Sequence, residues 1–175
     1  LYLLLSLLSK FFSISLISLK LQQLLEQSGS NVVLTRSDNN AIYDIDKKTL
    51  REKKNSDIRN RVRIGNNSSA DIFVSIHLNK IPENQYYGWQ TFFKDGNEDG
   101  KRLANCIQNN LNETIQKGNK RTPLKINNVY IIKHVEIPTV IVECGFLSNP
   151  TEEQELKTDA HQELIVKGIS DGIDK

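Results

Sequence analysis

Two short apolar runs, each ending in a polar residue, constrain the fold more than any other feature of the chain. Asp71–His77 reads DIFVSIH, and Thr139–Glu143 reads TVIVE. Runs that are apolar on both faces and rich in β-branched residues are typical of strands buried in a parallel sheet. Because parallel strands need long crossover connections, helices are expected between such runs.

Amphipathic segments and further short strands alternate along the rest of the chain. The helices predicted from apolar spacing and capping residues cover 14–25, 50–65, 101–116, a start at Asn149-Pro150 and a last helix through 164–173. The additional strands predicted are 31–35, 88–93 and 129–132. This alternation predicts an α/β fold with a single twisted, mostly parallel sheet and helices on both faces.

Composition limits the class of protein without naming a function. The chain has 175 residues, of which 38% are apolar and 25% charged, so it can bury the core of one domain. The net charge of +2 is mild and demands no charged partner. Cys106 and Cys144 lack CxxC spacing, which gives no support to a zinc ribbon or a redox dithiol.

The first 25 residues contain no acidic side chain and only two basic ones, Lys10 and Lys20. Leu1–Leu8 resembles the hydrophobic core of a signal peptide, but Lys10 and several serines interrupt the pattern. The spacing of Ile14, Ile17 and Leu21 favours a packed helix, and membrane anchoring or export stays open as the alternative. We therefore divide the chain into an atypical hydrophobic segment, 1–13, and a domain, 14–175.

His77 and Glu143 are the residues that point to chemistry. Each directly follows an apolar strand, and ligand sites in α/β sheets gather outside the carboxyl ends of strands. An imidazole and a carboxylate at this rim can form a site with a metal and a base. The alternative is that His77 is a structural hydrogen-bonding residue; His134 and His161 are expected to be surface residues.

Other functional classes find little support. There is no GxGxxG, no P-loop and no GxSxG motif. The basic stretch Lys47–Arg63 could meet phosphates, but Glu52 and Asp57 interrupt it and no aromatic set accompanies it. We predict a solvated helix face there and no nucleic-acid partner.

Two segments resemble a known enzyme family. Asn66–Asn79 (NNSSADIFVSIHLN) is similar to the "AN…ADIFVSIHAN" segment of zinc-dependent N-acetylmuramoyl-L-alanine amidases of the amidase-3 type, and Val140–Asn149 (VIVECGFLSN) to their "VLVECGFLSN" segment. Thr35-Arg36 and Arg61 also match family positions. Pro123–Lys133 resembles the sporulation branch, which matures spore cortex peptidoglycan.

The resemblance implies hydrolysis of the amide between N-acetylmuramic acid and L-Ala of the peptidoglycan stem peptide, outside the cytoplasm, in the cell wall or spore cortex. It makes His77 a Zn²⁺ ligand and Glu143 the catalytic carboxylate, which deprotonates the metal-bound water and later protonates the leaving amine. Asn79 and Arg61 would support the site.

The chain departs from the family at its start. The family's "DPGHGG" strand and the Glu before its first helix supply two zinc ligands, and neither is found here. We therefore expect a missing first strand, an exposed sheet edge or a gap beside Asn31–Thr35, and little zinc-dependent activity, as a truncated or frame-disrupted gene would give. A non-catalytic peptidoglycan-binding or regulatory module is the alternative, and the sequence predicts no oligomeric state.

Overall fold

The computed structural model describes residues 2–7, 12–38 and 40–175, with one six-stranded sheet covered by helices. The strands are β1 (Tyr2–Leu7), β2 (Asn31–Leu34), β3 (Ile72–Asn79), β4 (Gln90–Phe93), β5 (Leu124–Lys125) and β6 (Thr139–Phe146). The helices are α1 (Phe12–Gln27), α2 (Leu50–Asn67), α3 (Glu98–Ile115), α4 (Tyr130–His134), α5 (Pro150–Glu155) and α6 (Asp159–Ile173). Side chains are described from residue 15 onward, again except residue 39.

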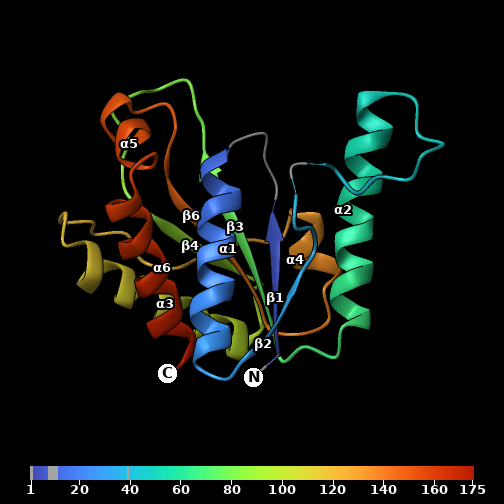
Figure 1. Cartoon of the computed structure of the whole chain (residues 1–175), viewed down its shortest axis with the longest axis horizontal. Coiled ribbons are helices and arrows are strands. Elements are labelled where there is room, and N and C mark those ends of the chain that lie inside the picture. The colour runs from blue at the N-terminus through green and yellow to red at the C-terminus, as the bar shows by residue number, and fades with distance from the viewer. Residues whose placement is uncertain (1, 8–11, 39) are drawn as a thin grey trace.

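The sheet has the strand order β2-β1-β3-β6-β4-β5. All neighbouring strands run parallel except β4 and β6, which are antiparallel. Figure 1 shows α1, α3 and α6 on one side of this sheet and α2 and α4 on the other. The predicted fold, a mostly parallel sheet with helices on both faces, is confirmed.

The expectation of a missing first strand and a gap beside Asn31–Thr35 is wrong. Tyr2–Leu7 forms β1, which pairs in parallel with β2 on one side and β3 on the other, for example Leu4 with Val33 and with Phe73. A Leu-rich run can serve as a buried strand because parallel strands read as continuous apolar runs, which periodicity alone does not distinguish from other apolar segments. Residues 1 and 8–11, including Lys10, lie outside the described residues, and the division at residue 13 stays a prediction.

The strand expected at Val129–Ile132 is also corrected. Tyr130–His134 forms the short helix α4, with Val129 as its N-cap. Ile131 and Ile132 are both buried although they are adjacent, whereas alternate residues of a strand point to opposite faces. Short apolar runs are ambiguous between helix and strand, and here packing against α2 decides for helix.

The face covered by α1, α3 and α6 is apolar. Ile17, Leu21 and Leu25 of α1 are fully buried there with Val74 and Ile76 of β3. Helices α3 and α6 approach closely at two glycines of α6. A Cβ on Gly172 would lie 2.5 Å from Cα of Ile107, and one on Gly168 would lie 2.9 Å from a methyl of Leu111.

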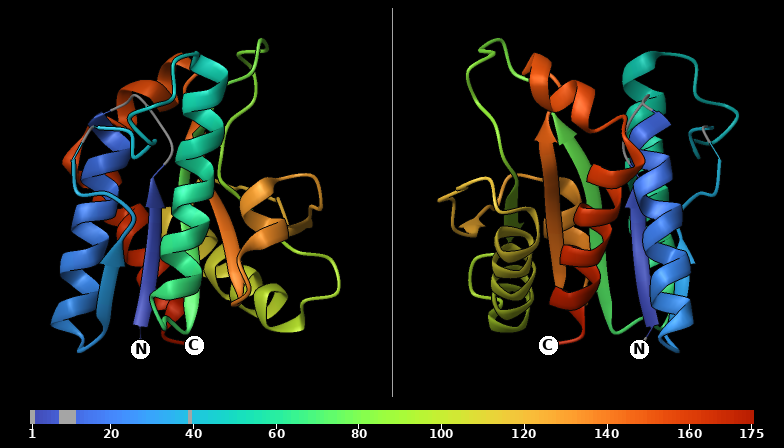
Figure 2. Two further views of the ribbon diagram at one scale, coloured as in Figure 1. Left: turned by 90° about the vertical axis from the view of Figure 1, so that its right-hand side faces the viewer. Right: turned by 60° about the vertical axis from the view of Figure 1, so that its left-hand side comes forward.

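The face covered by α2 and α4 has a smaller apolar cluster and more buried polar groups. Helix α2 begins with a capping box, in which Thr49 accepts from Glu52 N–H and the Glu52 carboxylate accepts from Thr49 N–H. Its inner side combines Val62 with the buried charges Asp57 and Arg61. Figure 2 shows α2 running along one side of the sheet, with α1 across from it.

Within the described ranges, no helix has the length and apolar character needed to cross a membrane. Both cysteines are free thiols, with Cys144 buried and Cys106 partly exposed.

Candidate functional site

His77 and Glu143 lie side by side on the two central strands. They are register partners in the parallel pair β3–β6, just before an irregularity in the pairing. Partners in a sheet point to the same face, and Phe73, four residues before His77 on β3 and so on the same face, packs into the cluster under α2 and α4. Both side chains therefore face the α2–α4 side. The sequence predicted that each residue ends its strand, but β3 continues to Asn79 and β6 to Phe146, so the pair lies two and three residues before the carboxyl ends.

Burial moves the pKa values of this pair in opposite directions. Burial, with a smaller contribution from the positive charge of Arg61, lowers the pKa of His77 to about 4. It raises the pKa of Glu143 to about 7, and Oε2 of Glu143 is buried without a hydrogen-bond partner. At neutral pH the site thus holds a neutral imidazole beside a carboxyl that can both accept and donate a proton.

Ser75 is the hydrogen-bond partner of His77. Its Oγ lies 2.9 Å from Nε2 of the ring, within reach for a serine activated by a histidine. Ser75 is fully buried, however, so a substrate cannot reach its hydroxyl. The contact orients the imidazole and does not supply a nucleophile.

Arg61 and Asn79 occupy different positions around the pair. Arg61 is 1% exposed and donates to the Asp57 carboxylate at 2.6 and 3.2 Å and to Thr35 Oγ1 at 2.8 Å. Arg61 influences the site through its positive charge, which lowers the pKa of His77. Asn79 lies two residues beyond His77 on the same face of β3, and its carbonyl accepts from the N–H of Leu147 at 2.7 Å.

The donor side chains present do not fit a zinc site. A catalytic zinc ion is normally held by three protein ligands and a water. Among residues 2–7, 12–38 and 40–175 no group of three or more His, Cys, Asp or Glu side chains could hold a metal ion. Residues 1, 8–11 and 39 include none of these four types, and Glu26 lies at the far end of α1.

Glu152 is a buried residue of this region that the sequence reasoning missed. Its carboxylate accepts from Gly88 N–H at 2.7 Å and from Phe146 N–H at 2.9 Å, which ties the segment before β4 to the end of β6. Burial raises the pKa of Glu152, while these two backbone hydrogen bonds oppose that shift. Asn149-Pro150 correctly predicted the helix start, with Asn149 accepting from Glu152 N–H, but nothing in the pattern showed that Glu152 points inward.

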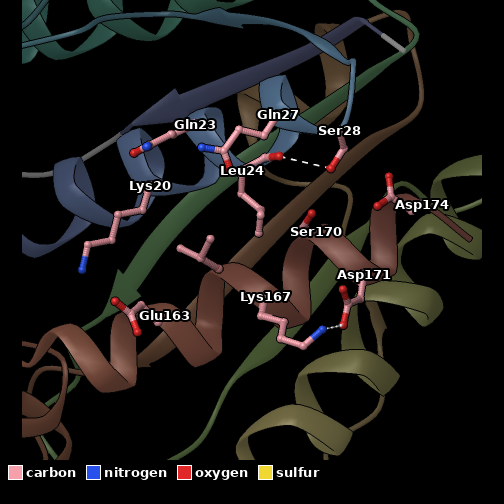
Figure 3. A pocket seen from close by; sticks show the side chains of 11 residues that line it. Lys20, Gln23, Leu24, Gln27, Ser28, Glu163, Lys167, Ser170, Asp171 and Asp174 are labelled. Atoms are coloured by element: carbon pink, nitrogen blue, oxygen red, sulfur yellow. Dashed lines mark hydrogen bonds and ion pairs between the residues drawn. The ribbon is translucent and has the colours of Figure 1, made fainter.

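A groove of about 550 Å³ between α1 and α6 lies on the opposite face of the sheet (Figure 3). Lys20 and Gln23 of α1 and Glu163 and Lys167 of α6 line it. Since it lies on the far side of the sheet from His77 and Glu143, it is not part of their site.

The other two histidines were both expected at the surface. His161, at the start of α6, is instead buried at 7% exposure, whereas His134 is exposed as expected.

Comparisons with known proteins identify the family. Residues 10–175 match the family model Amidase_3, N-acetylmuramoyl-L-alanine amidase. A germination-specific N-acetylmuramoyl-L-alanine amidase of Bacillus subtilis is 29% identical over 157 residues, which are 90% of this chain and 66% of that protein. Probable cell wall amidase LytH of Staphylococcus aureus is 25% identical, over 88% of this chain and 45% of its own length.

The solved structures agree. The CwlD amidase of Clostridioides difficile, determined in complex with the GerS lipoprotein, has a TM-score of 0.95 and 36% identity, covering 99% of this chain and 96% of that one. These names agree with the sporulation branch that the sequence predicted. The order of the strands, the paired His77 and Glu143, and these matches together place the chain in the N-acetylmuramoyl-L-alanine amidase family, whose members are peptidoglycan hydrolases.

Proposed function

We propose that this protein recognises the amide between N-acetylmuramic acid and L-Ala of peptidoglycan, in the cell wall or spore cortex, and that these 175 residues hydrolyse it slowly or not at all. The observation that carries the proposal is the pairing of His77 with Glu143 near the carboxyl ends of β3 and β6, with Glu143 Oε2 buried and unpartnered. The family assignment supplies the substrate class.

Glu143 is the residue we assign to proton transfer. Hydrolysis needs a proton removed from the attacking water and a proton delivered to the nitrogen as the C–N bond breaks. A carboxyl with a pKa of about 7 suits both steps near neutral pH. The family is generally zinc-dependent and the ion polarises the carbonyl in such enzymes, but the donors described here do not complete that site. Slow hydrolysis is therefore expected, with binding retained.

The test separates binding from turnover. Metal content of the purified chain is measured, and muropeptides are incubated with and without added zinc while released stem peptide is followed by mass spectrometry. We expect less than stoichiometric zinc, turnover close to background, and muropeptide binding that a chelator leaves unchanged.

Glu143→Gln removes the proposed proton carrier, and Glu136→Gln, an exposed carboxylate before β6, is the matched control. One zinc per chain with rapid turnover that Glu143→Gln abolishes would refute the slow-hydrolysis part of the proposal. Absence of both binding and turnover would refute all of it.

A further inference from the structure

Phe146 extends the site along β6, on the same face as Glu143. His77 pairs with Glu143, and Asn79 pairs with Phe146. Between these two pairs the chain advances two residues on β3 and three residues on β6. This bulge brings Phe146 to the face that His77, Asn79 and Glu143 share, because register partners point the same way. At about 3.3 Å per strand residue, Phe146 lies within about 10 Å of Glu143.

Arg121 lies against the ring of Phe146. Its guanidinium carbon is 5.1 Å from the ring centroid, and the Tyr86 ring is 6.3 Å away on a tilt of 33°. Phe146 is only 4% exposed under these neighbours, whereas Tyr86 is 43% exposed and Arg121 is half-buried. Of the ion pairs and hydrogen bonds formed between described residues, none uses the Arg121 guanidinium. A guanidinium that is stacked on a ring in this way keeps its N–H donors free for an anion.

The segment that carries Arg121 is fixed to the same rim. Gln90 is the register partner of Glu143 on β4, and its side-chain amide donates to the carbonyl of Thr122, next to Arg121. Asn119 donates to the carbonyl of Trp89 at 2.8 Å and accepts from the N–H of Arg121 at 3.3 Å. A side chain positioned before binding loses less conformational entropy when a ligand arrives.

We propose that Arg121, supported by Phe146, binds a free carboxylate of the stem peptide about two residues beyond the amide at Glu143. This inference rests on the proposed function, because the substrate places the carboxylate. An extended peptide advances about 3.5 Å per residue. If the second residue of the stem peptide is glutamate, as in the probe below, its carboxylate therefore lies about 7–10 Å from the scissile amide. That matches the spacing between Glu143 and Phe146 along β6. Arginine is suited to carboxylates because its planar fork donates two parallel hydrogen bonds.

The test compares two probes on the full chain by isothermal titration calorimetry, without metal. The probes are N-acetylmuramoyl-L-alanyl-D-glutamate and the same compound with both glutamate carboxyls converted to amides. Arg121→Ala should weaken binding of the acid about tenfold or more and change binding of the diamide by less than about twofold, since only the acid loses a charge-assisted contact. Arg121→Lys, which keeps the charge but not the fork, should fall between.

Arg102→Ala, an exposed arginine on α3 near the opposite end of the sheet, controls for the loss of a surface charge and should leave both probes unchanged. Circular dichroism confirms that each variant is folded. Equal weakening of both probes by Arg121→Ala, or no weakening, overturns the role of Arg121 while leaving the proposed function standing. If neither probe binds the unaltered chain, the proposed function fails as well.

Discussion

The two faces of the sheet are built on different principles. Beneath α1, α3 and α6 the core is apolar, and the helices meet through glycines and aliphatic side chains. Beneath α2 and α4 lie the half-buried His77 and Glu143 of the sheet and the fully buried ion pair of Arg61 with Asp57 on α2. The site lies on the face that is more difficult to stabilise, because each buried charge there needs a partner or a shifted pKa.

The contrast indicates that the apolar face supplies most of the stability, while the polar face carries the candidate site. A large apolar face contributes stability that is insensitive to pH, since burial of apolar surface involves no titratable group. The polar face then tolerates an unpartnered carboxyl at Glu143 Oε2, which an isolated hairpin or helix could not keep buried.

The largest effect is expected at the buried ion pair. Arg61→Met leaves the Asp57 carboxylate buried without its partner and should lower the free energy of unfolding by about 3–5 kcal/mol, measured by urea denaturation. Adding Asp57→Asn should recover part of this loss, because the uncompensated charge is removed while the amide oxygen can still accept from Ile42 N–H. Arg59→Met, exposed on the same helix, should change little; a similar loss there would show that the charge of α2, and not the buried pair, matters.

On the apolar face, stability should depend on side-chain volume and not on charge. Gly172→Ala places a Cβ 2.5 Å from Cα of Ile107, so α3 and α6 must separate, at a loss of about 1–3 kcal/mol. Thermal unfolding followed by circular dichroism measures the change. Glu163→Ala, exposed on the same helix, is the control and should have a small effect. A neutral Gly172→Ala would mean that the helices are not held as closely as this face requires.

The sequence predicted the mostly parallel sheet and the nearness of His77 to Glu143, but it did not predict β1 or the long-range contacts of Glu152 and Arg121. His77 and Glu143 were found because a polar residue ending a buried strand has a defined place at the rim. β1 was missed because a Leu-rich run has no period that distinguishes a buried strand from a signal core. Glu152 and Arg121 were missed because their partners are backbone groups and a ring far away in sequence, which local patterns do not encode.

His77 and Glu143 should make the free energy of unfolding depend on pH in opposite directions, and the two effects should nearly cancel. Glu143 has a folded pKa of about 7, above its usual 4.5, so the folded state keeps a proton that the unfolded state loses, and stability falls as pH rises through this window. His77 has a folded pKa of about 4, below its usual 6.5, so stability instead rises with pH between these values.

Replacing one residue of the pair should make the pH dependence contributed by the other visible in the free energy of unfolding. Glu143→Gln should leave stability rising between about pH 4 and 6.5, and His77→Gln should leave it falling between about pH 4.5 and 7, each with a limiting slope of about 1.4 kcal/mol per pH unit. Urea denaturation across this range, in a chelator, measures the slopes. Glu136→Gln should reproduce the profile of the unaltered chain. Parallel profiles for all variants would show that the pair is not buried as described.

The smallest effect is expected at the ion pair between Lys20 of α1 and Asp159 of α6. Lys20 Nζ lies 2.7 Å from Asp159 Oδ1, but the Asp159 side chain is 83% exposed, so water and salt screen the pair. Lys20→Gln should therefore lower the free energy of unfolding by less than about 1 kcal/mol, and the difference should vanish at about 1 M salt. Leu21→Ala on the same helix, which removes a fully buried side chain, is the comparison and should cost several times more. If Lys20→Gln matched Leu21→Ala, α1 would be held by charge, and the contrast between an apolar face and a polar face would no longer describe how this sheet is stabilised.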